Sequence, residues 1–106
     1  MNRYIINGIF NDLADGKSVA LHANLGDAKQ VFEEIISSFP KIAIETITRI
    51  NGQEKISLYN GGQLRLIPPT CGSLRGHVPN VLITDELLDP NDEAAMIAHG
   101  TEIIPT

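Results

Sequence analysis

The sequence predicts a single α/β domain over residues 1–106, a three-layer sandwich in which about three helices cover a mixed sheet with an antiparallel ribbon. Three observations support this prediction. Apolar residues recur at helical spacing in two early segments, two Asn-Gly steps separate alternating segments in the middle, and a short apolar strand precedes a helix-start signal in the last quarter. The length of 106 residues is that of one domain.

The composition is that of a folded chain without the charge pattern of a nucleic-acid-binding protein. Hydrophobic residues make up 42% of the chain and charged residues 20%, and the formal net charge is -5. This balance disfavours unaided tight binding to DNA or an anionic membrane, so we expect any contact with DNA to be indirect. No apolar run approaches the roughly 20 residues that span a bilayer. No secretory signal is evident and Cys71 is the single cysteine, so we expect a cytoplasmic protein.

The first part of the chain predicts a helix, a strand and a second helix. Residues 4–14 form an amphipathic helix that stops at Gly16, and a short apolar strand covers residues 18–23. Asn24 caps the second helix, which Pro40 ends. This helix has the most regular pattern of the chain, because its apolar residues recur on one face: Ala28, Val31, Phe32, Ile35, Ile36 and Phe39.

The middle of the chain changes to the period of strands. Three segments at 42–50, 55–59 and 63–67 are separated by Asn51-Gly52 and by Asn60-Gly61-Gly62. Because Asn-Gly steps favour tight hairpin turns, we expect antiparallel ribbons here. A polar loop then follows over residues 70–80, and a loop of this length in a small domain is usually functional or mobile.

The last quarter predicts a central strand and a third helix. Residues 81–84 form the strand, and Asp89 caps a helix that begins with Pro90 and stops near Gly100. We expect the strands at 18–23 and 81–84 to lie side by side in parallel.

The strongest functional signal is the pair of carboxylates, Asp85 and Glu86, that directly follows the strand at 81–84. In open α/β sheets, ligands bind outside the carboxyl ends of the strands. In a nucleotide-hydrolysing core, the first acid holds Mg²⁺ with its water shell and the second polarises the attacking water. The alternative interpretation is two solvated acids at the end of a strand.

Several segments, in this order, resemble the ATPase domain of phage terminase large subunits, which are RecA-like P-loop motors. The matching stretches are residues 20–36, Asn60-Gly61-Gly62 with the strand after it, the loop Ser73-Leu74-Arg75-Gly76, and the strand that ends in Asp85-Glu86. The resemblance spans most of residues 3–86. It implies that Asp85 is the magnesium-site acid, that Glu86 is the catalytic carboxylate, and that the loop around Arg75 lies near nucleotide or DNA.

The sequence departs from that family at the phosphate-binding loop. Such a loop requires Gly-x-x-x-x-Gly-Lys-[Ser/Thr], whose amides and lysine surround the phosphates at the start of a helix. Gly16-Lys17-Ser18 matches only the end of this motif, because Asn11 stands at the position of the first glycine. Asp12 and Asp15 also place negative charge where phosphate would bind. A phosphate-binding loop follows a strand and precedes a helix, whereas here a helix is predicted before the motif and a strand after it. We therefore interpret residues 11–18 as a chance match to the motif and not as a phosphate-binding loop.

Three hypotheses follow. In the order of elements of the terminase family, a true phosphate loop would lie just upstream of Arg3. The first hypothesis is therefore a truncated RecA-like core, encoded by a phage or prophage, that does not hydrolyse ATP on its own. It would act through a protein partner or as a homodimer. The second is a weak Mg²⁺-dependent ATPase, or part of a DNA-packaging motor, in which Lys17 and Ser18 bind ATP together with Asp85 and Glu86. The third is that the chain is a piece of a longer protein.

Overall fold

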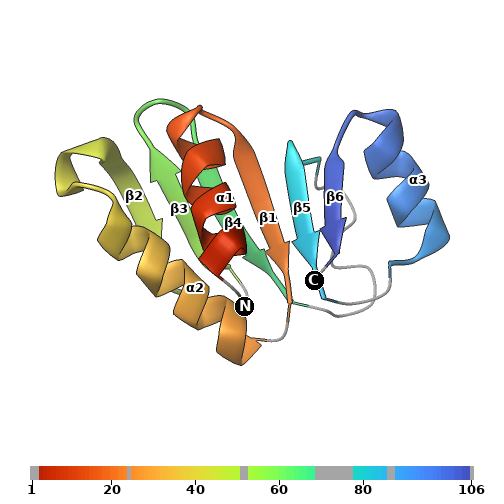
Figure 1. The fold of residues 1–106 in the computed structure, drawn as a ribbon, viewed down its shortest axis with the longest axis horizontal. Helices are drawn as coiled ribbons and strands as arrows, with labels where there is room; N and C mark the ends of the chain where they lie inside the picture. Colours follow the sequence, from red (N-terminus) through yellow and green to blue (C-terminus); the bar gives the residue numbers. More distant parts are fainter. Residues whose placement is uncertain (1–2, 24, 51–52, 69–77, 86–87, 106) are drawn as a thin grey trace.

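A computed structural model of the protein describes residues 3–23, 25–50, 53–68, 78–85 and 88–105 (Figure 1). Its elements, in chain order, are α1 (Arg3–Ala14), β1 (Ser18–His22), α2 (Leu25–Ser38), the 3-10 helix η1 (Lys41–Ala43), β2 (Ile44–Thr48), β3 (Lys55–Leu58), β4 (Gln63–Ile67), β5 (Val81–Thr84), α3 (Pro90–Ala98) and β6 (Glu102–Pro105). The prediction of an α/β fold with a mixed sheet, an antiparallel ribbon and about three helices is confirmed.

The six strands form one sheet in the order β2-β3-β4-β1-β5-β6. Strands β4, β1, β5 and β6 run parallel to one another, whereas β2 and β3 form an antiparallel ribbon against β4. Val19 pairs with Val81 and His22 with Thr84, which confirms the predicted parallel pairing of these two strands. β1 therefore lies inside the sheet, between β4 and β5.

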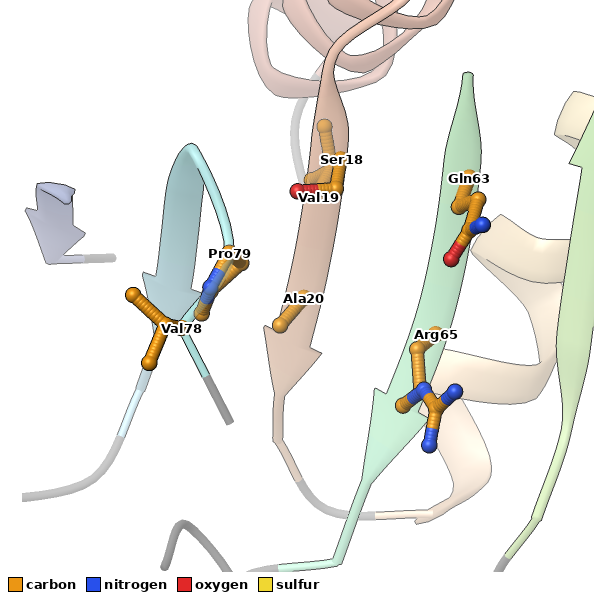
Figure 2. Close-up of a pocket in the computed structure, with 7 residues that line it drawn as sticks. All are labelled: Ser18, Val19, Ala20, Gln63, Arg65, Val78 and Pro79. Atoms are coloured by element: carbon orange, nitrogen blue, oxygen red, sulfur yellow. The ribbon is translucent and has the colours of Figure 1, made fainter. Parts of the chain in front are cut away.

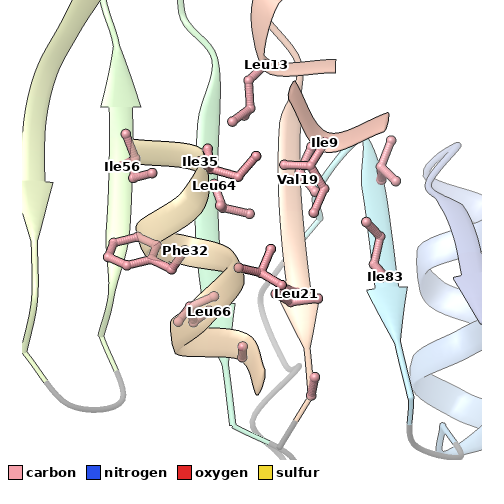
Figure 3. Close-up of a cluster of buried hydrophobic side chains, with 14 of the residues drawn as sticks. Ile9, Leu13, Val19, Leu21, Phe32, Ile35, Ile56, Leu64, Leu66 and Ile83 are labelled. Carbon is pink, nitrogen blue, oxygen red and sulfur yellow. The ribbon is translucent and has the colours of Figure 1, made fainter. Parts of the chain in front are cut away.

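Helices cover both faces of the sheet. Side chains of successive strand residues point to opposite faces, so alternate residues of β1 pack against different helices. Val19 and Leu21 of β1 belong to the large buried cluster under α1 and α2, to which Phe32 also contributes (Figure 3). Ala20, between them, belongs to a smaller cluster on the other face, where Met96 of α3 is buried. The result is the three-layer arrangement of helices, sheet and helix.

Local signals explain where two of the helices begin and end. Asp89 accepts a hydrogen bond from the Asn91 amide at 2.8 Å and Pro90 is the first residue of α3, as the sequence predicts. α1 ends at Ala14, and Gly16 follows in the turn, where its φ of 81° suits glycine and its amide donates to the Leu13 carbonyl at 3.0 Å.

The structure differs from the sequence prediction at two places. β2 is shorter than the alternating segment 42–50, because η1 occupies its start. Strand β6 was not predicted, since Glu102–Pro105 is short and ends in proline. Proline is tolerated there because β6 is the last strand on its side of the sheet. The predicted cap Asn24, the turn Asn51-Gly52 and most of the loop 70–80 lie outside the described residues.

Candidate functional site at the carboxyl edge of the sheet

The carboxyl ends of β1 and β5 lie next to each other, at the point where the chain leaves in two directions. After β1 the chain continues through α2 to the strands on one side, and after β5 it continues through α3 to β6 on the other side (Figure 1). Such a switch in direction is where α/β sheets bind ligands. Asp85 directly follows β5 here, and it is exposed. Its amide donates to the His22 carbonyl at 3.3 Å, which ties the two strand ends together.

A buried polar pair lies one residue before this edge. The Nδ1 atom of His22 and the Oγ1 atom of Thr84 are 2.9 Å apart, and the two residues are only 5% and 4% exposed. They face each other because they are register partners on adjacent parallel strands. Their pairing depends on the register of the sheet, because the two residues are 62 positions apart in the chain.

Lys17 and Ser18 lie at the amino ends of the parallel strands, whereas Asp85 lies at their carboxyl ends. Ser18 opens β1, whereas Asp85 lies just past the residue that pairs with the last residue of β1. These two levels are five strand residues apart, which is roughly 16 Å at about 3.3 Å per residue. The structure therefore does not bring Lys17 and Ser18 together with Asp85.

The polar groups of Ser18 are bonded within the fold. The Ser18 amide donates to Asn80 Oδ1 at 2.8 Å, and the Ser18 hydroxyl donates to the same oxygen at 3.2 Å. The hydroxyl also accepts a hydrogen bond from the Asn80 amide at 3.0 Å. These bonds link the start of β1 to the residue before β5, so the Ser18 groups that would meet phosphate or Mg²⁺ have structural partners.

The residues before Ser18 form the end of a helix and not the start of one. The amide of Lys17 donates to the Asp12 carbonyl at 2.9 Å, which satisfies a carbonyl of the last turn of α1. The Lys17 ammonium lies 3.8 Å from Asp12 Oδ1. Burial raises the pKa of Asp12, while Lys17 acts in the opposite direction. Because a helix carboxyl end carries partial negative charge, this position does not favour an anion.

Two predicted site residues, Arg75 and Glu86, lie outside the described residues. Asp85 is thus the one acid of the predicted catalytic pair that has a described position. In the part of the chain with described coordinates, no three His, Cys, Asp or Glu side chains gather into a metal site. The magnesium role of Asp85 stays a prediction.

A pocket of about 270 Å³ lies on the sheet face opposite α1 and α2, between β1 and β4 and beside the start of β5 (Figure 2). Gln63 and Arg65 of β4 line it together with Ser18, Ala20 and Pro79. Lys55 of β3 pairs with Arg65 across the strands, so two cations are neighbours on this face. Arg65 is not among the predicted site residues, although the alternation of β4 places Gln63 and Arg65 on one face.

Comparison with known proteins leaves the family open. No protein-family model matches the chain, and no curated protein matches it. Across the residues with described structure, none of the helices has both the length and the apolar character needed to cross a lipid bilayer.

Proposed function

We propose that this protein is a terminase-ATPase-like phage or prophage protein that works in the cytoplasm without hydrolysing ATP on its own, and that it acts by binding a protein partner or a second copy. The observation that carries the proposal is the position of Lys17 and Ser18, at the other end of β1 from Asp85.

The proposed relation to terminase ATPases is supported by the position of Asp85 at the carboxyl ends of the parallel strands. All four residues of β5 are buried, and this strand ends in an acid beside the switch in chain direction. This is the position at which a motor-type ATPase needs its magnesium acid. Three of the four segments that resemble terminases contribute to the layers around β1: the end of β1 with α2, the turn at Asn60 with β4, and β5. The fourth, residues 73–76, lies outside the described residues.

The absence of autonomous hydrolysis is supported by the geometry at the other edge. Phosphoryl transfer is catalysed by holding the phosphates and the metal in one place. Ser18 is roughly 16 Å from the level of Asp85, counted along the strands, and Lys17 lies one residue farther away. Their backbone amides also donate to Asp12 and Asn80 within the fold. A single ATP site built from both edges is therefore not supported.

A nucleotide titration tests the proposal. We expect no Mg²⁺-dependent ATP hydrolysis by the wild-type chain, and no difference in ATP binding between Lys17→Ala and Lys41→Ala, an exposed lysine on η1. The opposite result is turnover that Glu86→Ala abolishes, with ATP affinity lost in Lys17→Ala but kept in Lys41→Ala. That result would establish the alternative of a weak ATPase.

A further inference from the structure

The sheet face opposite α1 and α2 carries positive charge where β3, β4 and β1 lie side by side. Leu64 of β4 is buried under α1 and α2, so its neighbours Gln63 and Arg65 lie on the opposite face. Lys55 of β3 pairs with Arg65 and shares that face. No residue of β1, β3 or β4 is an aspartate or a glutamate, although the chain as a whole has a formal net charge of -5.

The pairing of Lys55 with Arg65 sets two like charges against each other. Directly opposed residues of antiparallel strands have Cβ atoms about 4.5–5.5 Å apart, and like charges in this arrangement destabilise a sheet. Both residues are half-buried, so salt screens their charges less than it would at a fully exposed position. An anion bound beside this pair would therefore offset a repulsion that the fold itself contains.

In the described part of the chain, no acid neutralises this pair. The ion pairs between residues with described positions involve neither Lys55 nor Arg65. Glu54, which precedes Lys55, is buried on the other side of the sheet, where its Oε2 atom lies 4.0 Å from Nζ of Lys29 on α2. The positive charge on this face is thus left for a group from outside the described chain.

The pocket of about 270 Å³ on this face combines hydrogen-bond donors with apolar surface (Figure 2). Arg65 and Gln63 line it from β4, and their guanidinium and amide groups supply N–H donors. Ala20, Val78 and Pro79 line it from β1 and from the segment before β5. The pocket therefore suits a small molecule with an anionic group at one end and an apolar part at the other.

We propose that this pocket binds a small organic phosphate monoester. Its phosphate group accepts hydrogen bonds from Arg65 and Gln63, and its organic part packs against Ala20 and Pro79. Arg65 lies between the pocket and Lys55, because β4 separates β3 from β1 in the sheet. Lys55 therefore adds to the positive potential at the pocket without lining it.

The charge of the site favours a phosphate monoester over other small anions. A monoester carries a charge of about −1.5 to −2 near pH 7, which matches two cations. A carboxylate or a phosphate diester carries a single charge and leaves one cation uncompensated. The planar guanidinium of Arg65 also fits two phosphate oxygens at once. Liquid water takes up about 30 Å³ per molecule, so a pocket of about 270 Å³ has room beyond the phosphate group itself.

A titration at constant ionic strength, followed by proton–nitrogen correlation NMR, tests the class of ligand. The probes are phenyl phosphate as the monoester, dimethyl phosphate as the diester, inorganic phosphate, and acetate. We expect phenyl phosphate to cause saturable shifts of the amide signals of residues 18–20 and 63–65. Inorganic phosphate should act on the same signals more weakly, because it lacks the organic part. Dimethyl phosphate and acetate should bind about ten-fold more weakly than phenyl phosphate, because each carries a single charge.

Variants that each remove one positive charge locate the site. Arg65→Gln should weaken the binding of phenyl phosphate at least about ten-fold, because it removes the guanidinium hydrogen bonds. Lys55→Gln should weaken it about three-fold, because Lys55 acts on the phosphate through space. Lys41→Gln, the same change at an exposed lysine on η1, should leave the affinity unchanged.

Thermal unfolding separates loss of binding from loss of folding. Without ligand, Arg65→Gln should unfold at the wild-type temperature or above it, since it removes one of two opposed like charges. Phenyl phosphate should raise the Tm of the wild type and of Lys41→Gln equally, because it binds the folded state. It should raise the Tm of Arg65→Gln much less.

Three results would overturn the inference: no saturable shifts with phenyl phosphate, equal affinity in Arg65→Gln and the wild type, or binding of acetate as tight as that of phenyl phosphate. Tighter binding of a single-stranded oligonucleotide without terminal phosphates at the same residues would also overturn it, because the site would then recognise a nucleic-acid backbone.

The outcome is independent of the proposed function. Neither Lys17 nor Asp85 lines this pocket. ATP bound through Arg65 would therefore have equal affinity for Lys17→Ala and Lys41→Ala and would not be hydrolysed. Failure of phenyl phosphate to bind would leave the proposed function in place, and ATP hydrolysis that depends on Glu86 would leave this inference in place.

Discussion

Replacing Gly62 by alanine should destabilise the protein strongly, because Gly62 packs directly on the end of α1. A Cβ atom built at Gly62 would lie 2.5 Å from the Leu13 carbonyl oxygen and 3.0 Å from Asn60 Oδ1. Neither neighbour can easily move. The Leu13 oxygen belongs to backbone, and the Asn60 amide group is held by donating to the Leu13 and Ala14 carbonyls at 3.0 and 3.1 Å and by accepting from the Gly62 amide at 2.8 Å.

The magnitude follows from the two ways in which the clash can be relieved. Overpacking of a rigid site costs about 1–3 kcal/mol. If instead the turn moves away from α1, the hydrogen bonds of Asn60 weaken, at about 1 kcal/mol each. We therefore expect the free energy of unfolding to fall by about 3 kcal/mol, which lowers the Tm of a domain of this size by roughly 10 °C or more.

Urea denaturation followed by far-UV circular dichroism measures this change, and Gly8→Ala provides a matched control. Gly8 lies inside α1, and a Cβ atom there has nothing within 4 Å. The same substitution should raise the free energy of unfolding by about 0.5–1 kcal/mol at that position. The reasoning is refuted if Gly62→Ala unfolds at the wild-type urea concentration, or if the two variants shift the midpoint in the same direction.

Three further predictions concern the core, the buried polar pair and one surface ion pair. Phe32→Ala should cost about 3–5 kcal/mol in urea denaturation, because Phe32 is only 2% exposed. Thr84→Val should cost about 1–2 kcal/mol by removing the hydrogen bond to His22, and an unchanged midpoint would contradict the 2.9 Å contact. The Arg49 guanidinium, by hydrogen bonding to Glu33, holds the pKa of that carboxyl below its ordinary 4.5. The stabilisation that this contact gives is complete above the pKa that Glu33 has in the unfolded chain, and it is lost as the pH falls through the lower pKa of Glu33 in the folded chain. The difference in free energy of unfolding between wild type and Glu33→Gln should therefore shrink below pH 4.5.

Much of the fold follows from local patterns in the sequence. Helical spacing predicts α1 and α2, the Asn60-Gly61-Gly62 step predicts the β3-β4 turn, and Asp89-Pro90 predicts the start of α3. Such signals are local because hydrogen bonds within a helix, turn or cap join residues close in sequence. Strand β6 carries no comparable signal in the sequence. Its backbone is extended because it pairs in parallel with β5.

The candidate site was predictable only in part. A buried strand that ends in an acid is visible in the sequence, and the parallel pairing of β1 with β5 could be expected from the order of elements. The pairing of His22 with Thr84 depends on register, because these residues are 62 positions apart along the chain.

The sequence by itself determined the class of fold, the helices and the buried strand β5. Side-chain periodicity and the cap, glycine and proline signals at the ends of elements act over only a few residues. Only the tertiary structure decided that Lys17 and Ser18 lie at the opposite end of the strands from Asp85, that Gly62 packs against the end of α1, and that β2 is the last strand on its side of the sheet in the described part of the chain. These are relations between segments distant in the chain, and they are set by strand order and register, which no local pattern encodes.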